Sequence, residues 1–155
     1  MNNLGLMHQT GRGVSASDRE AAAWYRQAAD QGYARAQFNL ALLLEQGRGV
    51  PRDIDQAIGL LRGVAPQGHL RAQMHLTELF ASGRGVATDP REALHWFAAA
   101  AGQGHADAAF VMGEAHMAGF GVPRNPPVAI GWYRRAAAQG HAGALTRLAE
   151  FGQAN

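Results

Sequence analysis

Residues 83–104 read GRGVATDPREALHWFAAAAGQG, and this stretch holds every marker of a unit that recurs along the chain. The opening tetrad, Gly-Arg-Gly-Val, is repeated at residues 11–14 and 47–50, and the variant Gly-Phe-Gly-Val occupies residues 119–122. The tetrads therefore begin at residues 11, 47, 83 and 119, which is a period of 36 residues. The Gln-Gly pairs at 31, 67, 103 and 139 have the same period, and two markers in one register indicate an array of structural repeats.

Each repeat carries signals for two helices. The first glycine of the tetrad suits the left-handed residue that closes a helix. Three residues after each tetrad comes an N-cap residue, namely Ser17, Asp53, Asp89 or Asn125. Glu20, Gln56 and Glu92 follow at the positions that complete capping boxes. These signals predict helices over residues 2–10, 17–31, 33–46, 53–66, 69–82, 89–103, 105–118, 126–139 and 141–152, with 53–66 the least regular because it contains Pro66 and two glycines.

Helical periodicity predicts which side chains are buried. The second helix of three repeats carries an aromatic pair, and we expect its tryptophans, Trp24, Trp96 and Trp132, to be buried between repeats. On the first helix, one arc is mostly small or apolar at about 100° per residue. This arc, the predicted core, holds Tyr33, Ala36, Gln37, Leu40, Ala41, Leu43, Leu44 and their copies.

The opposite arc of the first helices changes its residue types from repeat to repeat, as positions that face a partner do. It offers an apolar column beside an acidic one, which favours a peptide with apolar anchors and basic residues. The predicted partner-binding residues are Arg35, Phe38, Asn39, Leu42, Arg71, Met74, His75, Glu78, Phe110 and Glu114.

Simpler interpretations of these columns stay open. Phe38, Met74 and Phe110 border the core arc, so they could instead pack against the neighbouring repeat. The glutamates could form a solvated face. The turn arginines, Arg12, Arg48 and Arg84, could be solvated or could bind carboxylates or phosphates.

Composition and spacing disfavour an enzyme. The chain has 155 residues with no cysteine and no lysine, and its formal charge is only +2. This removes thiol, zinc–thiolate and Schiff-base chemistry. No His-Glu-x-x-His motif occurs, and the histidine column His69, His105 and His141 is predicted to start helices and pack there. Glu78 and Glu114 could imitate a glycosidase pair, but nothing in the sequence separates their roles. We therefore predict no catalytic residue, no metal and no cofactor.

The pattern closely resembles the Sel-one-like repeat family, a relative of the tetratricopeptide repeats. The residues that carry the resemblance are Ala36, Leu40, Gly47, Gly49, Val50, Asp89, Ala93, Trp96, Phe97, Ala100, Ala101, Gln103 and Gly104. It covers essentially the whole chain, 1–155, as a single all-α domain. The resemblance implies an α/α solenoid, a right-handed superhelix of about four and a half helix-pair repeats. It also implies an adaptor that binds another protein or peptide.

Other functions and the setting of the chain follow less directly. The alternative to a protein partner is nucleic acid or an anionic glycan, which the acidic column and the small net charge disfavour. No apolar stretch is long enough to enter a membrane.

In the repeat register Asn3 matches Asn39, so the chain starts inside a first helix. We expect either missing upstream sequence or an end that packs on another chain, giving a monomer or an end-to-end dimer. The arginine-only composition indicates a bacterial protein, cytoplasmic as it stands, or periplasmic or secreted if a signal peptide precedes it.

Overall fold

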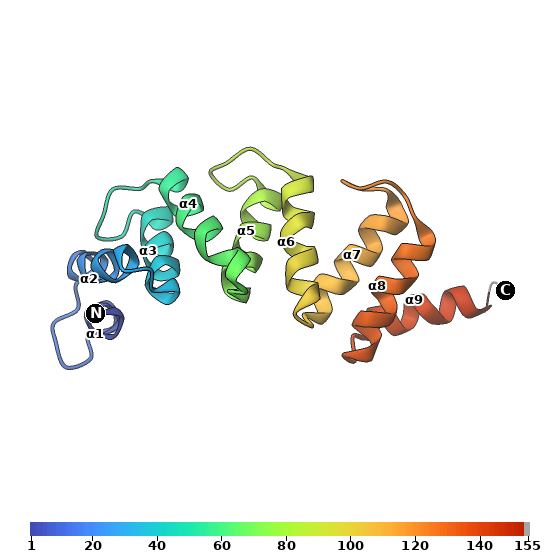
Figure 1. The fold of residues 1–155 in the computed structure, drawn as a ribbon, viewed down its shortest axis with the longest axis horizontal. Helices are drawn as coiled ribbons and strands as arrows, with labels where there is room; N and C mark the ends of the chain where they lie inside the picture. Colours follow the sequence, from blue (N-terminus) through green and yellow to red (C-terminus); the bar gives the residue numbers. More distant parts are fainter. Residues whose placement is uncertain (154–155) are drawn as a thin grey trace. The chain divides into compact units, whose positions relative to one another are not determined.

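A computed structural model describes residues 1–153, and within that range the fold is all-α, without a β-strand. The chain divides into two compact units, Met1–Ala72 and Gln73–Asn155, which are described separately. The helices are α1 (Asn2–Thr10), α2 (Asp18–Asp30), α3 (Ala34–Gln46), α4 (Ile54–Val64), α5 (Leu70–Ser82), α6 (Pro90–Gly102), α7 (Ala106–Ala118), α8 (Pro126–Ala138) and α9 (Ala142–Gln153) (Figure 1). Odd-numbered helices are the first helices of their repeats and even-numbered helices are the second. The predicted helices are confirmed.

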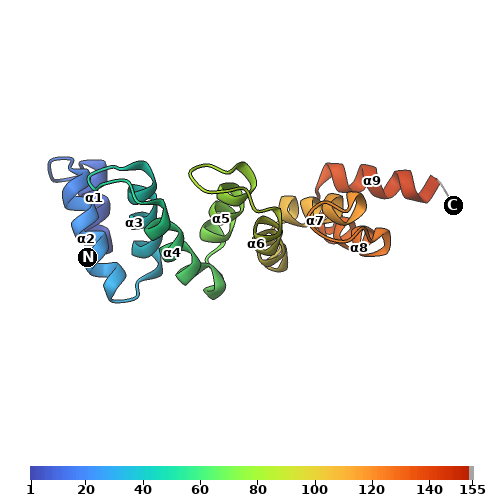
Figure 2. The same ribbon diagram turned by 90° about the horizontal axis from the view of Figure 1, so that it is seen from above.

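Within each unit, helices pack on their neighbours in sequence. In the first unit α1 packs on α2, α2 on α3, and α3 on α4. In the second unit α6 packs on α7, α7 on α8, and α8 on α9. Figures 1 and 2 show these neighbours lying side by side. The second helices α2 and α8 thus each pack on the first helix before them and on the first helix after them.

The helix ends form as the sequence predicts, with one exception. Ser17, Asp53, Asp89 and Asn125 each accept a backbone N–H from the first turn of the following helix. A capping box also requires the Glu or Gln side chain to accept the backbone N–H of the cap residue, and this part of the prediction is wrong. The N–H groups of these caps donate instead to carbonyl groups near the end of the preceding helix. Those carbonyls belong to His8, Leu44, Phe80 and His116. Each turn is thereby tied to the helix it leaves, and this satisfies carbonyls that a helix end would otherwise leave free.

The second helix of the second repeat is irregular, as predicted. Helix α4 ends at Val64, and residues Ala65–Gln67 continue as a 3-10 turn containing Pro66. A proline has no N–H to donate to the α-helical ladder, so the helix tightens there. Gly68 closes this turn in the left-handed conformation.

The core is built from alanines and larger apolar side chains of both helices of each repeat. Ala36, Ala72, Ala108 and Ala144 occupy one repeat column and are fully buried. Tyr25 and Tyr133 are also fully buried, and each lies against a glycine of the preceding first helix. A Cβ added to Gly5 would lie 2.5 Å from Cε1 of Tyr25, and one added to Gly113 would overlap the ring of Tyr133. Where the second helix carries Leu61 instead, the facing column position is Ala41.

Two burial predictions are partly wrong. Trp96 is buried, but Trp24 and Trp132 are half-buried, because in those two repeats the tyrosine of the pair takes the deep position. Tyr33 is 58% exposed, although its column was assigned to the core. It is the N-cap of α3, where the backbone is extended, so helical periodicity does not describe its direction.

Candidate partner-binding face

The apolar column of the first helices mostly packs between repeats. Phe38 is 4% exposed, with the His69 ring 5.0 Å from its centroid and the Arg71 guanidinium 4.7 Å above it. Its assignment as a partner contact is therefore wrong, since its neighbours in the next repeat cover it. Phe110 is half-buried and stacks on His141 at 4.4 Å between ring centroids, and Met74 is also half-buried.

The histidine column was predicted to start helices, and the structure shows how it does so. His69, His105 and His141 stand at the N-cap of α5, α7 and α9, and each Nδ1 accepts a backbone N–H three residues on. The acceptors and donors are 3.1–3.3 Å apart. A nitrogen that accepts a hydrogen bond carries no proton, so the cap at His69 needs a neutral imidazole with its proton on Nε2. Protonation would remove the acceptor beside the positive end of a helix dipole.

We expect the free energy of unfolding to fall as the pH is lowered from about 7.5 to about 5, through the ordinary histidine range. Burial lowers the pKa of His69, and Arg71 and Arg35 lower it further, so the stabilisation is present above the unfolded-state pKa and lost as the pH falls. His69→Asn supplies a cap without a titrating group, and it should flatten the pH dependence. His95→Asn changes an exposed histidine that caps no helix and should leave it unchanged. Urea unfolding at a series of pH values measures the free energy of unfolding of both variants and of the wild type. An equal change of this free energy with pH in the wild type and in His69→Asn would contradict the prediction.

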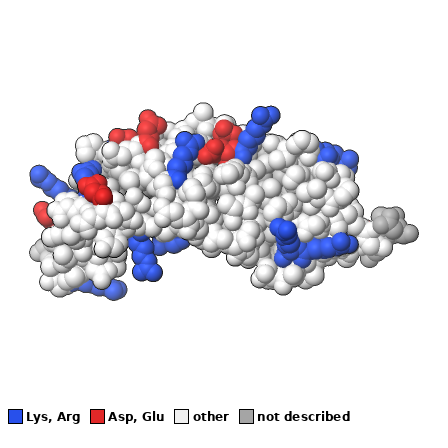
Figure 3. Space-filling model, in the orientation of Figure 1, with Lys and Arg blue, Asp and Glu red and all other residues white. Residues whose placement is uncertain are grey.

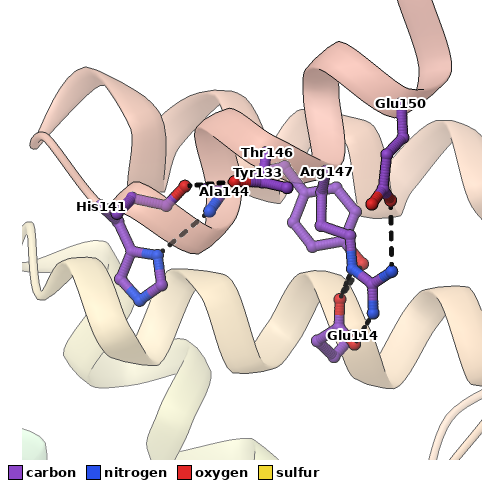
Figure 4. Close-up of polar contacts among 8 residues, drawn as sticks. Glu114, Tyr133, His141, Ala144, Thr146, Arg147 and Glu150 are labelled. Atoms are coloured by element: carbon purple, nitrogen blue, oxygen red, sulfur yellow. Dashed lines mark hydrogen bonds and ion pairs between the residues drawn. The ribbon is translucent and has the colours of Figure 1, made fainter.

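The acidic column is ion-paired inside the chain. Arg147 of α9 holds Glu114 of α7 with two hydrogen bonds, Nε to Oε1 at 2.8 Å and Nη2 to Oε2 at 2.9 Å (Figure 4). The same guanidinium reaches Glu150 at 3.3 Å. Arg147 lowers the pKa of Glu114, so the stabilisation by this pair is lost only as the pH falls through that lowered value. Arg147 lies 33 residues after Glu114, which is three residues fewer than the period of the repeat. This spacing is the signal that could have predicted the pair.

Tyr133 belongs to the same network. Its hydroxyl donates to Oε1 of Glu114 at 2.6 Å, and burial together with this carboxylate raises the pKa of the tyrosine. Figure 4 shows the tyrosine ring, the carboxylate and the guanidinium converging from α8, α7 and α9. Glu114 is thus held by both neighbouring helices and is half-buried.

The other predicted residues are accessible to different degrees. Arg35, Arg71 and Glu78 are exposed. Glu78 makes an ion pair with Arg84 at 3.3 Å and has the His75 ring nitrogen 4.0 Å away. Asn39, Leu42 and His75 are half-buried, and Asn39 donates to the side chain of Asn2. On the face shown in Figure 3, acidic and basic side chains lie next to each other in more than one place, as such pairs do.

The turn arginines also find partners in the chain. Arg48 binds both carboxylate oxygens of Asp18 at 2.9 Å, and Arg84 pairs with Glu78. The fourth turn carries Phe120 in place of the arginine, and its ring is 63% exposed. Beside Phe120 lies an apolar cleft of about 280 Å³ between the end of α5, α6 and α7, and all of its lining residues belong to the second unit. Ala81, Pro90, Phe97, Val111 and Ala115 line this cleft.

Among residues 1–153 no cluster of three or more histidine, aspartate or glutamate side chains could hold a metal ion. Glu78 and Glu114 both lie against arginines and do not form an acid–base pair. No described helix has the length and apolar character needed to cross a membrane.

Comparison with known proteins gives a consistent result. A family model described as the Sel1 repeat matches residues 1–33, 34–62, 70–105 and 106–141. A Sel1 repeat protein from Oxalobacter formigenes is 35% identical with a TM-score of 0.82, over 96% of this chain and 61% of that one. The protective antigen c5321 of uropathogenic Escherichia coli, which has an SLR fold, is 35% identical with a TM-score of 0.72, over 97% of this chain and 32% of that one.

More distant structures share the fold alone. Helicobacter pylori cysteine rich protein B is 20% identical with a TM-score of 0.57, over 83% of this chain and 95% of that one. This chain spans less than two thirds of the length of the Oxalobacter and Escherichia proteins. None of the curated protein sequences matches it.

Proposed function

Since the chain belongs to the Sel1 repeat family, a non-enzymatic family whose members are generally protein-interaction scaffolds, we propose that it binds a partner protein on the accessible face of its first helices. We call this the first-helix face. In the first unit it comprises Arg35, Asn39, Leu42 and Arg71, and in the second Met74, His75, Glu78, Phe110 and Glu114. Phe38 is excluded because it is buried.

One observation carries the proposal. Two neighbouring columns of the first helices differ in how far their residue types vary from repeat to repeat. Ala36, Ala72, Ala108 and Ala144 are identical and fully buried, as repeat packing requires. The column one residue earlier holds Arg35, Arg71, Asp107 and Gly143, of which the first three are exposed and differ in charge. Packing requires alanine throughout the uniform column but does not require the residue types of the varied one, although Arg71 also covers Phe38. A partner whose chemistry differs along its length would favour such variation.

Nucleic acid is a weaker candidate because the arginines are engaged or dispersed. A nucleic-acid site needs several basic side chains that neutralise phosphates together. Arg48, Arg84 and Arg147 are each paired with a carboxylate in the chain. Binding phosphates with them would first require breaking those pairs.

A charge swap tests the proposal. The double variant Arg35→Glu/Glu78→Arg keeps the net charge and alters exposed residues in both units, whereas the control Arg26→Glu/Glu20→Arg does the same on α2. Immobilised wild type and control are expected to retain a common set of proteins from a bacterial extract, and the swap variant is expected to lose it. Thermal unfolding checks that all three fold.

Single-stranded RNA and heparin serve as the competing probes. Saturable RNA or heparin binding by the wild type, falling steeply with salt and lost in the swap variant, would overturn the proposal in favour of an anionic ligand. Retention of the same proteins by wild type, control and swap variant would also contradict it, because the first-helix face would then make no contribution.

A further inference from the structure

The apolar cleft in the second unit exists because one repeat lacks a large side chain. Ala115 stands in the column of Leu43, Leu79 and Phe151. Leu43 and Leu79 are fully buried, and Phe151 lies beside Tyr133 with 6.3 Å between ring centroids. Phe97, which lines the cleft, is half-buried, whereas its counterparts Tyr25 and Tyr133 are fully buried.

The residues at the mouth of the cleft also differ in chemistry from their counterparts in the first unit. In the first unit the corresponding place is closed by the ion pair of Arg48 with Asp18. In the register of the repeats, Phe120 replaces Arg48 and Pro90 replaces Asp18. Both new residues line the cleft, and its charged lining residue, Glu114, is paired with Arg147, so an ionic closure has become a mostly apolar opening.

Two further lining positions follow the same trend. Val111 stands where other repeats have Asn39, His75 and Arg147. Ala118 stands where they have Gln46 and Ser82. A cavity left by chance would need only the change at Ala115. Removal of polar groups from the rim as well is what a site for an apolar group requires, because a buried polar group without a partner is costly.

We propose that this cleft binds one leucine or phenylalanine side chain of a partner protein, presented on an uncharged segment. The chemistry of the occupant comes from the repeats themselves, since the missing group in this place is the leucine or phenylalanine that Leu43, Leu79 and Phe151 supply from within the chain. A volume of about 280 Å³ suits such an anchor. Interface energy is concentrated in anchors of this kind, seated in pockets and surrounded by weaker contacts. The inference rests on the proposed function, because it names the chemistry of a partner contact adjoining the first-helix face.

The register supplies the variant that tests the cleft. Ala115→Leu fills it with the side chain that other repeats carry, so the protein should unfold at the same temperature or higher. Phe120→Arg restores the turn residue of the other repeats at an exposed position. This second variant tests the cleft if Ala115→Leu fails to fold. Ala23→Leu makes the same chemical change at an exposed position on α2 and is the matched control.

The probe is a phage-displayed library of short random peptides selected on the wild type. We expect enriched peptides to share a leucine or phenylalanine without adjacent charges. Synthetic versions should lose about tenfold or more in affinity for Ala115→Leu and for Phe120→Arg, and nothing for Ala23→Leu. Isothermal titration calorimetry measures these affinities.

Several results would overturn the cleft assignment. The first is that no peptide is enriched, and the second is that the peptides bind Ala115→Leu with unchanged affinity. The third is self-association of the wild type that Ala115→Leu abolishes, because a second copy would then be the occupant. Peptide binding lost in Arg35→Glu/Glu78→Arg but kept in Ala115→Leu would reject the cleft while supporting the proposed function. The two proposals can therefore fail separately.

Discussion

Replacing Trp96 by alanine is expected to destabilise the protein by about 3–5 kcal/mol, the usual cost of removing a large buried aromatic side chain. Trp96 is 5% exposed on α6, with the edge of its ring against His95 and its Nε1–H donated to Glu92 at 3.0 Å. The substitution removes the largest side chain of that helix and leaves a cavity that rigid neighbouring helices fill only in part. Chemical unfolding of both proteins measures the difference.

The same change at Trp132 provides the comparison. Trp132 occupies the equivalent position on α8 but is half-buried, and its ring is covered on one side by the Arg135 guanidinium at 4.7 Å. Since part of this side chain already faces water, Trp132→Ala should cost clearly less than Trp96→Ala. Equal losses, or a loss below about 1 kcal/mol at Trp96, would mean that the burial of this column is not as described.

Replacing Gly113 by alanine is expected to cost about 1–3 kcal/mol or more, although alanine is the better helix former. A Cβ at this position would overlap Cε1 and Cδ1 of Tyr133, whose ring is fully buried and tied through its hydroxyl to Glu114. Because the ring is fully buried and held by this hydrogen bond, we expect it to give way only at a cost. Thermal and urea unfolding of Gly113→Ala measure the loss.

Two further variants separate steric overlap from other causes. Gly131→Ala places the same methyl group on an exposed helical glycine with nothing within 4 Å, and it should stabilise by up to about 1 kcal/mol. The double variant Gly113→Ala/Tyr133→Leu copies the pair Ala41 and Leu61 of the second repeat. It should be less destabilised than the two single changes predict together. Additive losses would contradict a direct contact between the two positions.

The sequence predicted the exposure of some candidate residues correctly and of others wrongly, for one reason. Arg35, Arg71 and Glu78 are exposed as expected, because their direction follows from the helix to which they belong. Phe38 is buried because His69 and Arg71, one repeat later, close over it. Helical periodicity places a side chain on a face but does not say what the next repeat puts against that face.

The cleft was present in the sequence but could not be recognised there. Ala115 conforms to the small-residue pattern of its helix, so it looks like another core alanine. Only when Leu43 and Leu79 are seen to fill the equivalent space does alanine at 115 become a missing side chain. Phe120 is a visible departure from Gly-Arg-Gly-Val, but its meaning depends on Pro90, which lies 30 residues away in sequence.

The sequence by itself determined the all-α fold, the repeat and the helix boundaries. These depend on local signals, such as an N-cap at Asp89 or a left-handed glycine at Gly83, which act within one helical turn and recur in a fixed register. The tertiary structure alone decided which tryptophan is buried, that Glu114 is held by Arg147, and where an apolar cleft opens. Those outcomes depend on contacts between side chains about one repeat apart, and the volume and charge found there follow from packing, which no local pattern specifies.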